Sequence, residues 1–410
     1  MEKYKIVMLG EKDHGKSTLL ANLLIASKSV SHERINEVKN ISKKNKTRFE
    51  PAYILDAFSE ERDLGMTIDT TRANIAYKNK LIELIDVPGH LELIKNMMTG
   101  ASSSEIAVLV VSAKKNEGFK LETKRHLFLA SMFNLKTVII AVNKMDELDY
   151  NEKIFNRLKK QINDFLNMLD IKIKPIFIPI SAYDNENLTV KSQKIKWYNG
   201  KSLLETITGL KNNKKGNGKN KNKIRVLIQD TFDENNKSFS GIIYSGKLIK
   251  NSKIKILPKN IKAKIKSVSF LNRSSKSSNL KNVLISFFDK DLGVKRGDII
   301  YDLNSDPSYL DKFRAKIFLI NNIDLKNLKN IKIIFNNNEF GINKINILKA
   351  ISPLSGKLMD LKKIIKPDYS INAEINLNCR YPIEKFNEFE EFGRFLIFNK
   401  NKFAGIGIVF

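Results

Sequence analysis

The sequence is poor in features that would cross-link the chain or hold it in a membrane. Its 410 residues include a single cysteine, Cys379, which excludes a disulfide within the chain. No apolar run approaches the ~20 residues that a membrane-spanning helix needs, and the opening residues MEKYKIVMLG enter a strand-like run with no signal-peptide pattern. These absences predict a protein of the reducing cytoplasm that has no membrane partner.

Acidic residues are also scarce beside basic ones, 44 against 72, which gives a formal net charge of +28. Clustered lysine and arginine side chains neutralise nucleic-acid phosphates, so this charge is compatible with an RNA partner. The lysines are nevertheless scattered over every segment, and asparagine and isoleucine are abundant too, as in a chain of biased composition. The sequence leaves both interpretations of the charge open.

The first half of the chain alternates apolar runs with longer amphipathic stretches. The runs at residues 5–9, 81–85, 106–111, 137–142 and 176–180 are rich in Ile, Val and Leu, as strands covered on both sides require. Between the last two runs, apolar side chains recur at helical spacing over residues 154–169. We therefore predict an α/β P-loop domain with a mostly parallel sheet and helices on both faces over residues 1–210.

The period changes after residues 211–222, KNNKKGNGKNKN, which contain no apolar side chain and are predicted to form a basic linker. Beyond it, Ile261, Ala263 and Ile265 alternate with lysines, and apolar residues alternate with polar ones from Ile371 to Cys379, as in half-buried strands. Many short strands separated by turn residues predict two β-barrels. We place them at residues 223–305 and 306–410.

The most informative segment is residues 5–20, KIVMLGEKDHGKSTLL, where an apolar run leads into the pattern G-x-x-x-x-G-K-[ST]. In this pattern a loop joins a buried strand to a helix N-terminus, and its backbone N–H groups bind a polyphosphate. Glycines adopt backbone angles closed to other residues, the lysine supplies positive charge for the β- and γ-phosphates, and the serine hydroxyl binds Mg²⁺. The alternative is a chance turn rich in Gly and Lys. The loop residues predicted to bind the nucleotide are Gly10, Asp13, His14, Gly15, Lys16, Ser17 and Thr18.

Three further short motifs each follow an apolar run. Asp86-Val87-Pro88-Gly89 places a carboxylate that can hold Mg²⁺ through water, and the N–H of Gly89 can meet a γ-phosphate. Asn143-Lys144-Met145-Asp146 places a carboxylate, that of Asp146, which can accept both N–H groups of a guanine edge, while Asn143 and Lys144 brace the loop and cover the ring. Ser181-Ala182 can present a backbone N–H to the guanine carbonyl oxygen.

The order of the motifs carries more weight than any one of them, since a lone NKxD is more often an ordinary surface turn. Open α/β sheets bind ligands along the edge where their parallel strands end, and all four motifs are expected at that edge. The sequence therefore predicts a protein that binds GTP with Mg²⁺ and selects guanine through Asp146.

With these motifs the chain resembles the translational GTPase superfamily of the elongation factor Tu type. The resemblance rests on GEKDHGKST, ERDLGMTID at residues 61–69, DVPGH at 86–90, NMMTGA at 96–101 and NKMD. It implies that Thr67 binds Mg²⁺ when GTP is present and that His90 positions the attacking water, which makes Lys16, Thr67 and His90 the catalytic residues. Asp13 matches a family aspartate that helps to hold a monovalent cation or the second switch, and an Asx-type turn residue is the alternative.

Within the superfamily, the long charged segment between Ser17 and Thr67 resembles elongation factor one-alpha and its relatives. One relative is the large GTPase subunit of bacterial sulfate adenylyltransferase. The details that favour this relative include Ser27-Lys28, Arg125-His126, WYNG at residues 197–200 and GRFL at residues 393–396. On this interpretation the chain couples GTP hydrolysis to adenosine 5′-phosphosulfate synthesis, and a separate small catalytic subunit handles ATP and sulfate.

His14 departs from the pattern of the sulfate-assimilation subunit, which typically has aspartate there, and it agrees with translation factors. The alternative is therefore an elongation factor one-alpha-like or release-factor-like translational GTPase, whose partners are tRNA and the ribosome. Only this alternative implies a nucleic-acid partner. A further alternative of another class is a nucleotide-regulated scaffold with negligible turnover.

Overall fold

The computed structural model describes residues 2–44, 51, 53–54, 71–86, 106–132, 135, 137–169, 171, 173–210, 223–231, 238–270, 281–289, 292–305, 309–323, 327–352 and 369–410. The chain forms two compact units, Met1–Asn213 and Lys214–Phe410. Among the helices formed by the described residues, none has the length and apolar character needed to cross a membrane.

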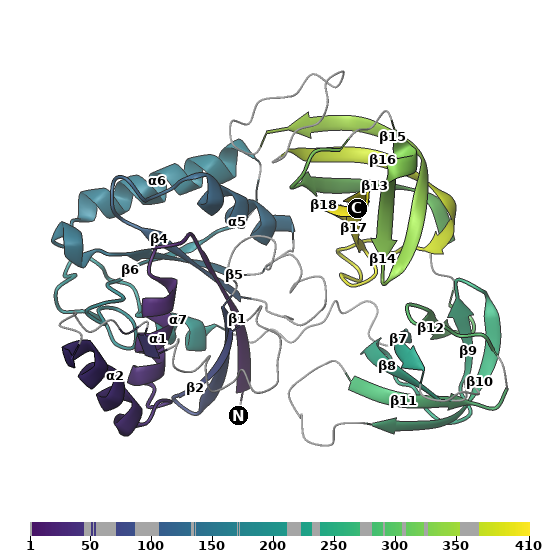
Figure 1. Cartoon of the computed structure of the whole chain (residues 1–410), viewed down its shortest axis with the longest axis horizontal. Coiled ribbons are helices and arrows are strands. Elements are labelled where there is room, and N and C mark those ends of the chain that lie inside the picture. The colour runs from purple at the N-terminus through teal and green to yellow at the C-terminus, as the bar shows by residue number, and fades with distance from the viewer. Residues whose placement is uncertain are drawn as a thin grey trace. The chain divides into compact units, whose positions relative to one another are not determined.

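The first unit is an α/β domain built on a six-stranded sheet (Figure 1). Its elements in chain order are β1 (Glu2–Gly10), α1 (Lys16–Ala26), α2 (His32–Lys44), β2 (Thr71–Tyr77), β3 (Lys80–Asp86), β4 (Ile106–Ser112), α5 (Leu121–Met132), β5 (Thr137–Asn143), the 3₁₀ turn η1 (Asp146–Leu148), α6 (Glu152–Met168), β6 (Ile176–Pro179) and α7 (Leu203–Gly209).

The strands of this sheet lie in the order β2-β3-β1-β4-β5-β6. Neighbouring strands are parallel except β2 and β3, which are antiparallel, so the sheet is mostly parallel as predicted. β2 is not among the strands predicted from the sequence. It is an edge strand, and its sequence TRANIAY lacks the continuous apolar run that marks the central strands.

Both faces of the sheet are covered, which confirms the predicted layers. Met8 and Val108 share a core with Leu19 of α1 and Leu204 of α7. Leu9, which has the opposite parity in β1, is equally buried, and Figure 1 shows α5 and α6 on the side of the sheet away from α1 and α7. Every residue of β4 is buried, and all of them except Ser112 are apolar, as expected of a strand covered on both faces.

The second unit contains two closed six-stranded antiparallel barrels, as predicted. Barrel II has the strand order β10-β11-β8-β7-β12-β9 and consists of β7 (Arg225–Thr231), β8 (Ser238–Ser245), β9 (Lys253–Leu257), β10 (Ile261–Phe270), β11 (Lys281–Phe287) and β12 (Ile299–Asp302). Barrel III has the order β13-β16-β15-β14-β17-β18 and consists of β13 (Tyr309–Leu319), the turn η2 (Leu328–Asn330), β14 (Ile331–Phe335), β15 (Asn338–Ile351), β16 (Ser370–Pro382), β17 (Arg394–Asn399) and β18 (Lys402–Val409). The domain boundaries at residues 210, 222 and 305 stay predictions, and no strand or helix named here crosses them.

The two barrels share an apolar cluster and a buried ion pair. Tyr301 of barrel II lies in the same cluster as Phe313 of barrel III. Arg225 of β7 is paired with Glu384, with side chains only 3% and 7% exposed, and its guanidinium lies 4.9 Å from the ring centre of Phe389. Burial raises the pKa of Glu384, and Arg225 opposes that shift. Contacts of this kind hold the two barrels together as one unit.

Cys379 is an exception to the predicted alternation in β16. Ile371 and Ile375 are buried as expected, whereas Cys379 is exposed. The pairing of β13 with β16 shifts register at this point, because Lys312 lies opposite Asn376 but Leu310 lies opposite Tyr381. Such a bulge turns the intervening side chains away from the core.

Candidate functional site

The described residues of the four predicted motifs lie at one edge of the first sheet. β1 ends at Gly10, β3 at Asp86 and β5 at Asn143, while Ser181 follows β6. These strands are parallel, so their carboxyl ends define a single edge. The fold therefore brings four motifs that are distant in sequence to the same place.

The loop between β1 and α1 has a backbone that requires glycine at two points. Gly10 has φ +146°, and a Cβ there would lie 2.6 Å from the carbonyl oxygen of Val110. Gly15 has φ +91°, and a Cβ there would overlap the side-chain amide of Asn143. Gly15 is also the N-cap of α1, and no side chain caps this helix end. Because glycine has no side chain to cap this helix end, the first N–H groups of α1 are suited to bind an anion such as phosphate.

Lys16, the first residue of α1, turns back over this loop. Its ammonium donates hydrogen bonds to the carbonyl oxygens of Gly10, at 2.8 Å, and Glu11, at 3.3 Å. Burial lowers the pKa of Lys16, and the carboxylates of Asp86 and Asp13 oppose that shift. Lys16 therefore lies within electrostatic reach of Asp86, the carboxylate predicted to hold the metal. Ser17 is exposed and Thr18 is half-buried in the same turn.

The remaining loop residues have different surroundings. His14 is buried, with Nδ1 3.3 Å from the carbonyl oxygen of Val110, and burial lowers its pKa, so the imidazole is neutral at pH 7. Asp13 is exposed and has φ +65°, a conformation found in turns. Glu11 accepts hydrogen bonds from the backbone N–H of Thr123, at 3.0 Å, and from its hydroxyl, at 2.9 Å. These two bonds attach the phosphate loop to the start of α5.

Asn143 joins the phosphate loop to the segment predicted to meet guanine. Its Nδ2 donates to the carbonyl oxygen of His14 at 2.8 Å, and its Oδ1 accepts from the N–H of Ala182, also at 2.8 Å. Asn22 of α1 adds a second link, because its amide donates to the carbonyl oxygens of Ala182 and Tyr183. The phosphate loop and the Ser181-Ala182 segment are therefore one hydrogen-bonded assembly.

Lys144 is held by a carboxylate from the loop after β4. It has φ +62°, and its Nζ lies 2.7 Å from Oε2 of Glu117, with the two side chains 20% and 29% exposed. Burial acts to raise the pKa of Glu117, but hydrogen bonds from Lys144 and Ser112 outweigh it and lower the pKa overall. Lys114 of the same loop pairs with Glu147. Two ion pairs thus connect the loop after β4 to the NKMD loop.

The residues predicted to contact guanine, Asp146, Ser181 and Ala182, differ in whether their polar groups already form hydrogen bonds within the chain. Asp146 begins η1 and is half-buried, and within the described part of the chain no residue forms a hydrogen bond or ion pair with its carboxylate. The N–H of Ser181 donates to the carbonyl oxygen of Glu186, at 3.3 Å, and that of Ala182 donates to Asn143. The guanine contact predicted for Ser181 and Ala182 stays a prediction.

Three predicted residues, Thr67, Gly89 and His90, lie outside the described residues. The switch and water-positioning roles assigned to them stay predictions.

The sequence analysis missed two residues that support the site. Asn22 carries a readable signal, since it is a buried polar residue in the apolar helix segment LLANLLIA. Glu117 carries none, because it lies 27 residues before Lys144 in an irregular loop and meets it only in the folded chain.

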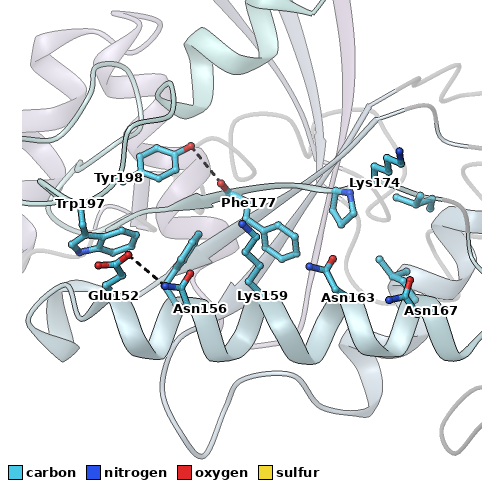
Figure 2. A pocket seen from close by; sticks show the side chains of 13 residues that line it. Glu152, Asn156, Lys159, Asn163, Asn167, Lys174, Phe177, Trp197 and Tyr198 are labelled. Atoms are coloured by element: carbon cyan, nitrogen blue, oxygen red, sulfur yellow. Dashed lines mark hydrogen bonds between the residues drawn. The ribbon is translucent and has the colours of Figure 1, made fainter.

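A separate hollow of the same unit lies along α6, as Figure 2 shows. It has a volume of about 560 Å³, and Phe155, Phe177, Trp197 and Tyr198 contribute aromatic side chains to its wall. No residue predicted to bind nucleotide lines it. The hollow is therefore not part of the assembly formed by the phosphate loop and the NKMD loop.

Comparison with known proteins decides the family. The family described as the elongation factor Tu GTP binding domain matches residues 1–215. Elongation factor 1-alpha of Thermococcus onnurineus is 30% identical over 420 residues, which cover 98% of this chain and 96% of that protein. The chain belongs to the elongation factor Tu and 1-alpha family of translational GTPases. Elongation factor 1-alpha of Picrophilus torridus is 32% identical, over 96% of this chain and 94% of that protein.

A solved structure shares the fold of this translational GTPase. The Ski7 GTPase-like domain of S. cerevisiae, bound to GDP and inorganic phosphate, aligns with a TM-score of 0.59 at 17% identity, over 100% of this chain and 97% of that domain. Membership of the family makes this chain a guanine-nucleotide-binding protein with a GTPase domain.

The comparisons do not support a particular closeness to sulfate adenylyltransferase or the small-subunit partner that it implies, because the relatives reported above are elongation factors 1-alpha. The residues that favoured it have structural surroundings. Arg125 pairs with Glu122, His126 is buried in α5, and the indole of Trp197 donates to the carbonyl oxygen of Tyr150. Residues with such local roles say little about a partner.

Proposed function

We propose that this protein is a translation factor of the elongation factor 1-alpha type, which binds aminoacylated tRNA in its GTP form and releases it at the ribosome after hydrolysis. The observation that carries the proposal is the extent of the similarity, which covers 98% of the chain and so includes both barrels as well as the GTP-binding unit. A shared nucleotide-binding domain alone would leave the partner open.

The phosphates of GTP are bound by the loop between β1 and α1. The N–H groups at the start of α1 face the phosphates, and Lys16 exchanges its bonds to the loop carbonyls for bonds to the β- and γ-phosphate oxygens. Because burial lowers the pKa of Lys16, binding a polyanion restores the environment that favours its charged form.

The donor set at this end of the sheet fits Mg²⁺. Ser17 offers a hydroxyl and Asp86 a carboxylate, which are the hard oxygen ligands that this ion prefers together with substrate phosphates and waters. The phosphates of the nucleotide and bound waters would complete the coordination. The ion would neutralise charge on the β- and γ-phosphates, and Thr67 is the further ligand contributed by the first switch.

Guanine is selected by Asp146, whose carboxylate accepts the two N–H groups of the base edge, while Lys144 covers the ring. Hydrolysis requires His90 to orient the attacking water. The γ-phosphate keeps Thr67 and Gly89 in place, and its loss releases both switches and with them the tRNA.

Two measurements test the proposal. The ester bond of an aminoacylated tRNA should be protected from hydrolysis by the protein with a non-hydrolysable GTP analogue and not with GDP. The Asp146→Asn variant should bind GDP about 10- to 100-fold more weakly, because charge-assisted hydrogen bonds worth ~1.5–3 kcal/mol are lost. It should bind xanthosine diphosphate better, since an amide can donate to the extra carbonyl of xanthine.

Protection that is equal in both nucleotide states would contradict the translation-factor proposal. Unchanged selectivity for guanine in Asp146→Asn would contradict the assignment of the base-reading carboxylate. Asp149→Asn is the matched control, because Asp149 lies in the same turn and is exposed.

A further inference from the structure

The turn that carries Asp146 has an unusual backbone. η1 is followed by two successive residues in the left-handed region, Asp149 with φ +48° and Tyr150 with φ +54°. Aspartate adopts this region readily, but a bulky residue such as tyrosine is found there only where its surroundings hold it against the strain. The conformation of Tyr150 therefore directs attention to the contacts around it.

Three hydrogen bonds engage every polar group of Tyr150. Its N–H donates to the carbonyl oxygen of Met145 at 2.8 Å, and its own carbonyl oxygen accepts from the indole N–H of Trp197 at 2.7 Å. Its hydroxyl donates to Oδ2 of Asp184 at 3.2 Å. Burial raises the pKa of Tyr150 to about 12, and the charge of Asp184 adds to the shift, so the hydroxyl is protonated at pH 7 and can donate.

The contact with Asp184 connects this turn to the segment that follows β6. The N–H of Asp184 donates to the hydroxyl of Ser181 at 3.0 Å, and its carboxylate lies 3.7 Å from the ammonium of Lys194. Asp184 is thus held by the same segment that contains Ser181 and Ala182. Tyr150 therefore links the two stretches of chain that are predicted to meet guanine.

Trp197, the other partner of Tyr150, is fixed by aromatic packing. Its ring centre lies 5.2 Å from that of Phe155, a buried residue of α6, and 6.4 Å from that of Tyr198. α6 begins at Glu152, two residues after Tyr150. The indole N–H therefore donates from a fixed position beside the end of the turn.

The carboxylate of Asp146 depends on this turn for its position. Within the described part of the chain, no residue forms a hydrogen bond with it, so no neighbouring side chain orients its two oxygens. The backbone of the turn sets where they lie. Hydrogen bonds weaken steeply when their distance or angle departs from the ideal, so the turn has to keep its shape for a base to be read.

We propose that Trp197 and Tyr150 are positioning residues for guanine recognition, which hold the turn in a strained shape and thereby place the carboxylate of Asp146 against the base. This inference rests on the proposed function in one respect, the assignment of Asp146 as the base-reading residue. When either hydrogen bond is removed, Tyr150 relaxes toward negative φ and Asp146 moves with it.

The readout is the ratio of the affinities for GDP and IDP, measured by calorimetry on the full chain. The base of IDP, hypoxanthine, lacks the 2-amino group of guanine, so Asp146 accepts two N–H groups from one base and one from the other. The ratio therefore reports how well the carboxylate is placed, whereas a general loss of stability would weaken both nucleotides alike.

Two variants remove one hydrogen bond each. Trp197→Phe keeps an aromatic ring in place and removes the indole N–H, and Tyr150→Phe removes only the hydroxyl. Tyr198→Phe is the matched control, because the hydroxyl of Tyr198 donates to the carbonyl oxygens of Phe177 and Lys201, which lie outside the turn.

The natural chain should bind GDP about tenfold or more tightly than IDP, the factor that a hydrogen bond to a charged group is worth. Trp197→Phe should weaken GDP binding about tenfold and IDP binding about threefold, because GDP has two contacts with the displaced carboxylate to lose. The ratio should therefore fall about threefold. Tyr150→Phe should lower it about twofold, and Tyr198→Phe should leave it unchanged.

Equal weakening of GDP and IDP in Trp197→Phe and Tyr150→Phe would overturn the proposal, because these residues would then only stabilise the fold. Unchanged binding in both variants would overturn it too. Circular dichroism confirms folding, and Tyr150→Phe, which removes a single oxygen atom, keeps the test decisive if Trp197→Phe is unstable.

The same measurements separate this inference from the proposed function. Equal affinity of the natural chain for GDP and IDP would remove Asp146 as the base-reading residue, and the positioning roles with it. Failure of the GTP-dependent protection of aminoacylated tRNA would count against the role in translation alone and leave the positioning result standing.

Discussion

At the scale of single residues, the site depends on side chains that bridge two loops. Asn143 uses both ends of its amide, one on the phosphate loop and one on Ala182. Lys144 is oriented by its ion pair with Glu117. Bridging residues of this kind position the groups that touch the ligand. Their substitution should therefore change the rate at which the nucleotide dissociates.

We expect Glu117→Gln to speed GDP dissociation about two- to fivefold, because an ion pair with this exposure is worth up to ~1 kcal/mol. The measurement is stopped-flow release of a fluorescent GDP analogue. Glu147→Gln is the control, since Glu147 pairs with Lys114 and not with Lys144. An identical effect of the two variants would show that general charge near the site, and not the position of Lys144, sets the release rate.

The pH dependence of this pair follows from the lowered pKa of Glu117. A carboxyl group with a lowered pKa in the folded chain contributes stability above its unfolded pKa, and the contribution is lost as pH falls through the folded value. The difference in GDP release between the natural chain and Glu117→Gln should therefore stay constant from pH 7 to 5. It should shrink only below about 4.3, the ordinary pKa of glutamate. A difference that disappears between pH 7 and 6 would point to another titrating group.

His90 is the residue for which the family predicts a direct part in hydrolysis. His90→Ala should lower single-turnover GTP hydrolysis about a hundredfold or more, as expected for loss of a group that orients or deprotonates water. GTP affinity should stay within about twofold. His32→Ala is the control, because His32 is an exposed residue at the start of α2. Normal hydrolysis in His90→Ala would remove it from the mechanism.

At the scale of elements, the loop between β1 and α1 requires a residue without a Cβ at position 15. Gly15→Ala would place a methyl group into the amide of Asn143 at φ +91°, which costs ~1–3 kcal/mol in backbone strain alone. We expect GDP affinity to fall more than tenfold, measured by calorimetry. Gly209→Ala is the control, since its new methyl group would lie 3.6 Å from the flexible end of Lys201. Full GDP binding by Gly15→Ala would show that the loop tolerates a different path.

Strands with a run rich in Ile, Val and Leu could be predicted from the sequence, and a strand without one could not. The five strands joined in parallel, β1, β3, β4, β5 and β6, are marked by such runs, and their ends locate the phosphate and guanine motifs. β2 is the antiparallel edge strand, and its sequence TRANIAY contains no such run. The ion pair of Lys144 with Glu117 joins residues of two irregular loops. Sequence periodicity predicts helices and strands, and it does not predict a contact between loops. The bulge that exposes Cys379 is likewise invisible, because alternation continues through it in the sequence.

At the scale of the whole molecule, the two barrels should lose stability together when the pair of Arg225 with Glu384 is broken. Glu384→Ala leaves a buried guanidinium without its partner, which costs ~3–5 kcal/mol. In thermal unfolding followed by far-UV circular dichroism, the strand signal should be lost at a lower temperature than in the natural chain. Trp197 is the chain's one tryptophan and belongs to the first unit. The unfolding temperature measured by its fluorescence should therefore be unchanged. Glu339→Ala is the control, because its pair with Lys332 is exposed. A parallel shift in both signals would show that the units unfold as one.

The buried contact of Arg225 with Glu384 also has a mechanical consequence. A guanidinium and a carboxylate enclosed among Tyr301 and Phe389 resist sliding, since any displacement would strand a charge away from water. A force on β7 of one barrel is therefore transmitted to the segment that follows β16 of the other, and the two barrels move as one rigid body.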